Sequence, residues 1–307
     1  MLKGVFLSVL ASVLFGSLYF YTTELDPLSG EEVYGWRMLL TLPVMSLFLF
    51  WSGDWGLVRS IAARLNKDWK LWIALPASSL LLGIQLWLFL WAPLHGHAMN
   101  VSLGYFMMPL VMVLIGRFYY KDTLTHWQKG AVLLAFLGVV HAVFQAGGFA
   151  WTSLLVCLGY PYYFVLRTQF KTDHLGGLWV DMLLMLPVAL YFAAAGQGLD
   201  AMLGMNTSLP LLILLLGVLS ASALVAYILA SKLLPFSLFG LLGYVEPVLL
   251  VLVAFLIGEN IAEKEWPTYI AIWLALALLV MEGLFKLNRQ AQPYALKDRI
   301  TAERSGS

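Results

Sequence analysis

The chain has 307 residues, of which 61% are hydrophobic and 11% charged, and its formal net charge is +1. Soluble domains carry about 25% charged residues, so most of this surface cannot face water. The composition excludes a soluble enzyme, a disordered scaffold and a disulfide-stapled secreted domain, and the net charge leaves no basic field to hold nucleic acid. Because Cys157 is the single cysteine, no intrachain disulfide can form.

A helix needs about 20 consecutive apolar residues to cross a membrane. The chain contains ten such runs, which are residues 4–22, 32–51, 71–92, 99–119, 128–146, 150–168, 177–195, 209–230, 237–257 and 267–286. They lack the alternating polarity of transmembrane β-strands. The largest connection, residues 52–70, contains an amphipathic segment that we expect to form a short helix at the membrane interface. We therefore predict an all-α integral membrane protein with ten transmembrane helices.

Lysine and arginine are distributed unevenly between the two sides of such a bundle. If the N-terminus is cytoplasmic and the spans alternate, every Lys and Arg falls on the cytoplasmic side except Lys264, which lies outside, and Arg37, which lies within a span. An excess of basic residues in cytoplasmic loops is the positive-inside rule. The pattern predicts a multi-pass protein of the inner (plasma) membrane with both termini in the cytoplasm.

The two halves of the sequence repeat each other. Arg37–Val44 matches Asp181–Val188 at six of eight positions, and Leu103–Tyr105 recurs as Leu242–Tyr244. Each half has five spans, an odd number, so the second copy must enter the membrane from the opposite side. Inverted repeats of this kind are the architecture of alternating-access transporters. We expect a first five-helix repeat in residues 1–147, a second, inverted five-helix repeat in residues 148–288 and a polar cytoplasmic tail in residues 289–307.

Four prolines lie within predicted spans in two repeat-related pairs, Pro43 with Pro187 and Pro109 with Pro247. Proline inside a helix removes a backbone hydrogen bond and usually kinks the helix. In a membrane the freed carbonyl must be satisfied by protein or by a wet cavity. These prolines are either hinges beside a cavity or elements of packing only, and the sequence leaves both interpretations open.

Two stretches of the chain, Gln85–Ala92 (QLWLFLWA) and Val101–Leu110 (VSLGYFMMPL), carry a family pattern, as do Arg37 and Gly243–Pro247 (GYVEP). Together they resemble the RarD-like branch of the EamA family in the drug/metabolite transporter superfamily. The resemblance covers about residues 4–288. It implies a ten-helix, two-repeat inner-membrane carrier with a central cavity, driven by a gradient or by none, but not by ATP. Members of the family are linked to chloramphenicol sensitivity and to export of amino acids and other metabolites.

The chain departs from that family at four positions. It has Gln85 and Met108 where asparagine is common, Phe15 where tryptophan is common, and Glu246 where glycine often precedes the proline. The resemblance places these positions along the implied cavity. The substrates of the family are therefore not carried over to this chain.

Among the ionisable residues within spans, Glu246, Arg37 and Asp181 are the candidates for function, because charges there are costly and usually face the protein interior. Glu246, near mid-membrane, either couples transport to protons, pairs a cationic substrate, or is a protonated carboxyl bonded to a kink carbonyl. Arg37 needs an anion unless it snorkels to the outer interface. Its candidate partners are a substrate carboxylate, Glu31, Glu32 and Glu246. Asp181, its repeat mate, either forms an inner gate or, as we favour, caps a helix or reaches cytoplasmic water.

Aromatic residues at repeat-related places are candidates to line a cavity for a planar or apolar solute. They are Tyr19, Trp87, Trp91, Tyr105, Tyr162, Tyr163 and Tyr244, and Gln85 is the polar candidate beside them. His95 and His97 have no acidic or cysteine neighbours, so we expect no metal site. We also expect no cofactor, no nucleic acid and no obligate protein partner. The expected partners are a small-molecule solute and the lipid bilayer, with protons as a further hypothesis.

These patterns favour a secondary, non-ATP, alternating-access transporter of small organic solutes or metabolites across the bacterial inner membrane, with proton coupling through Glu246 as a hypothesis. One alternative is a passive channel or facilitator with the same fold. The other, less favoured, is an integral membrane enzyme acting on a lipid-linked substrate. Such an enzyme would need clustered carboxylates or an activated nucleophile, and no H-E-x-x-H, Asp-rich or G-x-S-x-G motif is present. We therefore expect no enzymatic activity.

Overall fold

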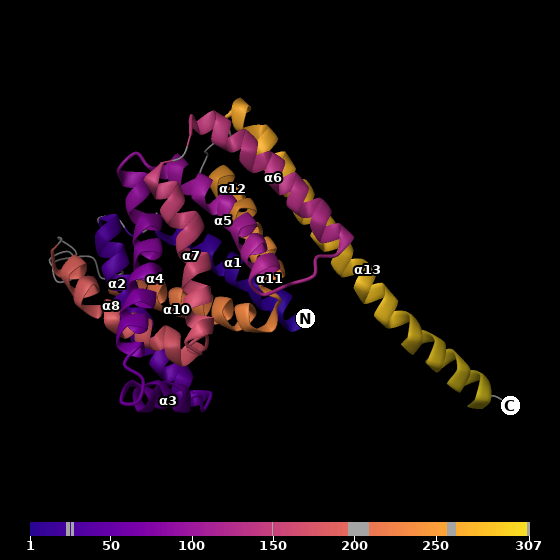
Figure 1. Cartoon of the computed structure of the whole chain (residues 1–307), viewed down its shortest axis with the longest axis horizontal. Helices are drawn as coiled ribbons and strands as arrows, with labels where there is room; N and C mark the ends of the chain where they lie inside the picture. Colours follow the sequence, from indigo (N-terminus) through magenta and orange to yellow (C-terminus); the bar gives the residue numbers. More distant parts are fainter. Residues whose placement is uncertain (23–24, 26–27, 149, 196–208, 257–261, 306–307) are drawn as a thin grey trace.

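Figure 1 shows the computed structural model of the chain, which describes residues 1–305 except 23–24, 26–27, 149, 196–208 and 257–261. Within the helices, the side chains at positions 19, 93–94, 98–99, 250, 252–256 and 286–305 also lie outside the described set. Throughout the described part, all regular secondary structure is helical, which confirms the predicted all-α class.

The helices follow the predicted apolar runs closely. In the first half they are α1 (Leu2–Thr22), α2 (Gly30–Trp51), α3 (Trp55–Leu65), α4 (Leu71–Leu94), α5 (Ala98–Phe118) and α6 (His126–Ala146). In the second half they are α7 (Trp151–Gln169), α8 (Leu175–Ala195), α10 (Leu209–Leu233), α11 (Phe236–Leu242), α12 (Val245–Leu256), the 3₁₀ turn η1 (Glu263–Glu265) and α13 (Trp266–Ser305). The interfacial helix expected within residues 52–70 is present as α3.

Eight of the described helices are long and apolar enough to cross a membrane, namely α1, α2, α4, α5, α6, α8, α10 and α13. The exposed surface agrees with a lipid surrounding, because large apolar side chains such as Phe144 (79% exposed) and Phe50 (75%) face outward. Arg37, Arg167 and Asp181 are instead each only 1% exposed. Contiguous exposed apolar surface is unusual for a soluble monomer. The chain is therefore a multi-pass membrane protein.

The ninth predicted run, 237–257, is divided between α11 and α12 rather than forming one continuous helix. Pro247 explains the break, because it has no N–H to donate to the carbonyl of Gly243 and its ring crowds that carbonyl. The Gly243 carbonyl accepts from the Glu246 N–H instead, at 3.3 Å, in a tighter 3₁₀-type turn. Pro247 thus lies in the first turn of α12, where proline is tolerated. Its repeat mate Pro109 lies inside the uninterrupted α5.

The helices pack in pairs that are far apart in sequence. α1 packs on α10, α2 on α8 and α10, α4 on α7 and α8, α5 on α7 and α11, and α6 on α13. In Figure 1, α6 and α13 run side by side along one edge of the bundle, and α13 continues beyond it. The main hydrophobic core lies among α1, α2, α4, α5, α7, α8, α10 and α11, and a smaller one joins α5 and α11 to α6 and α13.

Glycine sets how closely α2 approaches its neighbours. A Cβ atom added at Gly35 would lie 2.6 Å from the Ala193 nitrogen of α8. A Cβ atom at Gly217 of α10 would lie 2.4 Å from the Leu40 Cβ of α2. Both distances are shorter than real side chains allow, so only glycine fits at these crossings, as is common between membrane helices. This close packing holds α2 between α8 and α10 and places Arg37 in the interior.

Candidate functional site

A central cavity lies where most of the helices meet. It is lined by Phe15, Arg37, Leu82, Leu86, Phe89, Tyr105, Met108, Tyr160, Tyr163, Leu178, Leu224, Tyr227, Ile228 and Glu246. Its free volume is about 30 Å³, enough for ordered water but not for an organic solute. The structure therefore has the cavity in a closed form, and a solute can enter only if the surrounding helices move apart.

Two ionisable residues from different helices face this cavity, Arg37 of α2 and Glu246 of α12. They interact electrostatically, yet in the described part of the chain no ion pair within 4.0 Å joins them. The Nε atom of Arg37 donates a hydrogen bond to Ser220 Oγ of α10 at 2.9 Å. One N–H of the guanidinium is thus held by the protein.

The carboxylates proposed as partners of Arg37 have different positions. Glu32 belongs to the capping box of α2, where its Oε2 accepts from the Ser29 N–H at 2.8 Å and Ser29 Oγ accepts from the Glu32 N–H. Glu31 is not among the residues that interact with Arg37. Of the three candidates, only Glu246 shares the cavity with Arg37.

Tyrosines form much of the cavity wall. Tyr105 of α5 and Tyr160 of α7 lie with ring centroids 6.4 Å apart. The ring centroid of Tyr227 in α10 lies 6.5 Å from that of Tyr160 and 5.8 Å from that of Phe15. The wall therefore presents aromatic faces and phenolic hydroxyls together, a surface suited to a partly planar solute with polar groups.

Helix geometry explains which tyrosines of α7 reach the cavity. Tyr160 and Tyr163 are three residues apart, so they share one face of the helix, and both line the cavity. Tyr162, named from the sequence, lies on another face and is 63% exposed on the outer surface. Tyr160 and Tyr227 were missed by the sequence analysis. Tyr160 could have been found from the sequence, because its spacing of three residues from Tyr163 places both on one face of a helix.

The remaining candidates lie near the cavity but not along it. Gln85 donates from Nε2 to the Leu155 carbonyl at 2.8 Å and so ties α4 to α7. Trp87 lines a separate groove between α4 and α8 and stacks on Trp91. Tyr244 is fully buried and donates to the Phe106 carbonyl at 2.9 Å. The side chain of Tyr19 lies outside the described residues.

The three other candidate hinge prolines lie inside continuous helices, Pro43 in α2, Pro109 in α5 and Pro187 in α8. Pro161 is a further proline inside a helix, in α7 between two cavity tyrosines, and the sequence analysis did not single it out.

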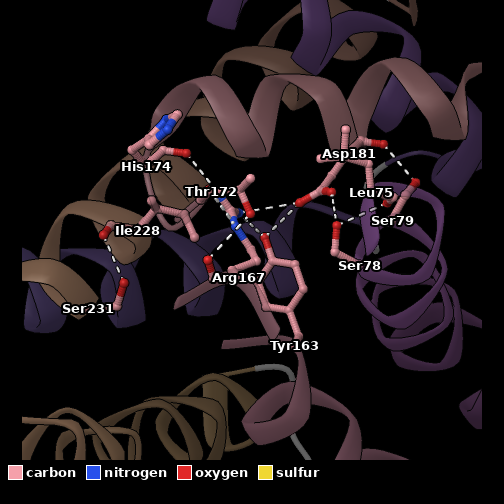
Figure 2. A network of polar contacts seen from close by, with 10 residues as sticks. All are labelled: Leu75, Ser78, Ser79, Tyr163, Arg167, Thr172, His174, Asp181, Ile228 and Ser231. Atoms are coloured by element: carbon pink, nitrogen blue, oxygen red, sulfur yellow. Dashed lines mark hydrogen bonds and ion pairs between the residues drawn. The ribbon is translucent and has the colours of Figure 1, made fainter. Parts of the chain in front are cut away.

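A second polar cluster, centred on Asp181 of α8, lies next to the cavity and is drawn in Figure 2. Asp181 accepts hydrogen bonds from Ser78 Oγ at 2.5 Å and from the Tyr163 hydroxyl at 3.0 Å. It also forms an ion pair with Arg167, in which Nη1 lies 3.3 Å from Oδ2. The Asp181 backbone carbonyl accepts from Ser79 Oγ at 2.9 Å. Asp181 is thus bound to α4 and α7 and does not reach solvent.

Arg167 connects this cluster to the turn between α7 and α8 (Figure 2). Its Nε donates to the Thr172 carbonyl at 2.9 Å and its Nη2 to the His174 carbonyl at 2.6 Å. Nη1 also donates to the Tyr163 hydroxyl. From the sequence alone, Arg167 is one of the basic residues on the cytoplasmic side. Nothing in its local sequence shows that it turns inward, because its partners come from three segments of the fold.

The same turn is held from outside by two other elements. Arg64 of α3 donates from Nη2 to the Phe170 carbonyl at 2.6 Å and from Nη1 to the Lys171 carbonyl at 3.1 Å. Lys232, near the end of α10, lies 3.9 Å from Asp173 in an exposed ion pair. Residues 170–174 therefore fasten α3, α7, α8 and α10 to one another. Tyr163 belongs to both the cluster and the cavity wall, so the two sites are continuous.

Comparison with known proteins agrees with this membrane architecture. The EamA-like transporter family matches residues 2–144. An uncharacterized transporter of Pasteurella multocida is 41% identical over 94% of this chain and 99% of its own length. The chloramphenicol-sensitive protein RarD of Pseudomonas aeruginosa is 40% identical over 94% of this chain and 97% of its own. A solved crystal structure, 18% identical, shares the fold with a TM-score of 0.62 over 91% of this chain and 96% of that one. The chain therefore belongs to the RarD-like branch of the EamA-like transporter family and is a membrane transporter of the drug/metabolite type.

Proposed function

We propose that the protein is a secondary, non-ATP, alternating-access transporter that carries small organic solutes or metabolites through the cavity between Arg37 and Glu246. The observation that carries the proposal is one interior cavity with a cation and a carboxylate on different helices. Because the cavity holds about 30 Å³, it must open by helix movement, which is the defining step of a carrier rather than of a permanently open channel.

The packing of the helices supports two inverted repeats, 1–147 and 148–288. In that scheme α1 corresponds to α7, α2 to α8, α4 to α10, α5 to α11 with α12, and α6 to α13. Three observed pairs join a helix to its own counterpart, α2 with α8, α5 with α11 and α6 with α13. The other pairs come in matched sets, since α1 on α10 corresponds to α7 on α4, and α2 on α10 to α8 on α4. This is the pattern expected of a pseudo-two-fold axis in the membrane plane.

Arg37 and Asp181 fit the same scheme as repeat mates. Arg37 on α2 bonds to Ser220 on α10, and Asp181 on α8 bonds to Ser78 on α4, which is the equivalent pair of helices. The Asp181–Arg167 cluster is then the closure on the cytoplasmic side, where the positive-inside rule places the α7–α8 turn. Asp181 does not reach cytoplasmic water, contrary to the interpretation that its sequence position favours, because its carboxylate is buried among Ser78, Tyr163 and Arg167. With this orientation both termini, including the 289–307 tail, lie in the cytoplasm.

Glu246 is the candidate coupling residue. It is half-buried in the cavity wall and forms no side-chain hydrogen bond in the described part of the chain. A carboxyl group that faces a cavity without a fixed partner is free to exchange a proton or a cationic group with whatever enters. When the Glu246 carboxyl group is ionised, the positive charge of Arg37 across the cavity attracts it. Binding of a substrate or a proton therefore changes the electrostatic interaction between Arg37 and Glu246.

The test is thermal unfolding of the detergent-purified protein against a panel of amino acids, nucleosides, amines and chloramphenicol at two pH values. Wild type is measured beside Glu246→Gln and Arg37→Gln. If one chemical class of solute stabilises wild type and stabilises both variants less, the cavity is supported as the solute site. A solute that stabilises all three proteins equally binds elsewhere, and that result contradicts the proposal. A passive facilitator would instead show ligand binding in which Glu246→Gln changes nothing at either pH.

A further inference from the structure

A second and larger cavity lies at the opposite end of the bundle from α3, where α6 ends and α13 begins. It is lined by Ser102, Leu103, Phe106, Ala142, Gln145, Ala146, Lys264, Glu265, Thr268 and Tyr269. Its free volume is about 320 Å³, which falls in the range of small-ligand sites. In Figure 1 this end of α6 and α13 lies at the top and α3 at the bottom.

This cavity is separate from the proposed transport site. The two share no lining residue, and α5 with the Tyr244 hydrogen bond to the Phe106 carbonyl stands between them. The free volume of the central cavity is about 30 Å³, whereas that of this cavity is about 320 Å³ in the same structure. A ligand here would therefore bind without passing through the transport path.

The polar groups of the cavity are available to a ligand. Lys264, Gln145 and Ser102 are exposed, and none of their side chains forms a hydrogen bond or ion pair within the described residues. Glu265 lies beside Lys264, so the rim carries one positive and one negative charge. The floor is apolar, with Leu103 and Phe106 buried. The cavity thus offers a cation and a carboxylate above a hydrophobic base.

Surrounding aromatic residues indicate the depth of the cavity in the membrane. Trp266 and Trp151 are both exposed at this end of the bundle, and Trp266 packs edge-on against Trp273. Exposed tryptophans at helix ends are typical of the membrane–water interface, where lipid headgroups lie. Lys264 is also the only Lys or Arg that the sequence pattern places outside the cytoplasmic face and the spans.

We propose that this cavity binds one zwitterionic phospholipid, with the phosphate on Lys264 and Gln145, the headgroup ammonium on Glu265, and the start of an acyl chain on Leu103 and Phe106. A primary ammonium fits a carboxylate better than a quaternary one, because it donates hydrogen bonds. The site therefore prefers a phosphoethanolamine headgroup to phosphocholine or phosphoglycerol. Because α6 and α13 pack on each other, the bound lipid would bridge them to α5 and stabilise the outer end of the bundle.

The test is binding of defined lipids to delipidated full-length protein, followed by native mass spectrometry and by thermal unfolding. Phosphatidylethanolamine, phosphatidylcholine and phosphatidylglycerol are compared, together with soluble phosphoethanolamine. Wild type should bind phosphatidylethanolamine most tightly. Lys264→Gln should weaken the binding of all three lipids about tenfold, which is the effect expected from losing one charge-assisted hydrogen bond. Glu265→Gln should remove the preference for ethanolamine while leaving phosphatidylglycerol binding unchanged.

Glu263→Gln is the matched control, because Glu263 is an exposed neighbour on η1 that does not line the cavity. It should bind all lipids as wild type does. Equal binding of the three lipids by wild type, or unchanged binding by Lys264→Gln, would overturn the proposal. Binding of soluble phosphoethanolamine with no gain from the acyl chains would also overturn it, and would assign the cavity to a soluble phosphoester.

Discussion

The carboxylate of Asp181 and the guanidinium of Arg167 lie 3.3 Å apart on neighbouring helices, and each side chain is only 1% exposed. Every other contact of the pair is also internal, with Ser78, Tyr163 and the carbonyls of the α7–α8 turn. A buried ion pair contributes little by itself, but removing one partner leaves the other charge buried and uncompensated. The pair therefore fixes how α7, α8 and α4 meet on one side of the cavity.

The first prediction concerns the stability that depends on this pair. Asp181→Asn and Arg167→Gln should each lower the free energy of unfolding by about 3–5 kcal/mol, because each leaves a buried group without its partner. The double variant should lose less than the sum of the two. Lys232→Gln is the control, since its pair with Asp173 is 3.9 Å long and 42% and 33% exposed, and exposed pairs contribute about 0–1 kcal/mol. Thermal unfolding in detergent measures all four. Additive losses in the double variant would show that the two residues act independently.

The second prediction concerns access to the cavity from the cytoplasm. The single native cysteine makes this measurable, because Cys157→Ser removes all thiols and Ile228→Cys places one on the cavity wall. In inside-out membrane vesicles, Arg167→Gln should increase the rate at which a water-soluble maleimide labels this cysteine, because the α7–α8 turn is released. Arg117→Gln, which removes an exposed hydrogen bond to the Asp122 carbonyl, should leave the rate unchanged. Equal labelling of the Arg167 variant and its parent would contradict a gating role.

The third prediction compares two tyrosines on α7. Tyr160→Phe should weaken binding of the solute that the ligand panel identifies by about five- to tenfold, because one hydroxyl of the cavity wall is lost. Tyr162→Phe should bind as wild type, since Tyr162 lies on the outer surface. Isothermal titration of both variants with the same solute measures the difference. A larger effect at Tyr162 would mean that the solute does not occupy this cavity.

The fourth prediction concerns pH. Burial lowers the pKa of His174 below its usual value, and the charges of Arg167 and Lys232 lower it further. The folded protein therefore disfavours the protonated ring, so stability is complete above the unfolded-state pKa of about 6.5 and falls as the pH drops below it. His174→Gln should remove this component, leaving a smaller loss of thermal stability between pH 7.5 and about 5 than in wild type. Identical pH profiles would show that the turn does not respond to His174 protonation.

Much of the fold was predictable, because span positions depend on local hydropathy. Nine of the ten predicted runs each overlap one helix, eight of the described helices are long and apolar enough to cross a membrane, and the interfacial segment is helical as α3. The break between α11 and α12 was not predicted, although Pro247 was known, because whether a membrane proline kinks or divides a helix depends on its neighbours. Pro43 and Pro187 leave their helices continuous.

The site was predicted less completely, because helix rotation and inter-helix partners decide it. Arg37, Glu246, Tyr105 and Tyr163 line the cavity, whereas Gln85, Trp87 and Tyr244 have structural contacts outside it. Tyr162 was chosen in place of Tyr160, two positions away and about 200° around the helix. Arg167 carried no sequence signal, since its partners lie on α7, α8 and the connecting turn.

We propose that solute and proton share the cavity between Arg37 and Glu246. The most direct test of this proposal is solute-driven proton movement in proteoliposomes that contain a pH-sensitive dye, with the amino acid, nucleoside, amine and chloramphenicol panel added outside. Wild type should move protons with one class of solute, and Glu246→Gln should bind that solute but move none. Equal proton movement by Glu246→Gln and wild type would contradict the account and make Glu246 a structural residue.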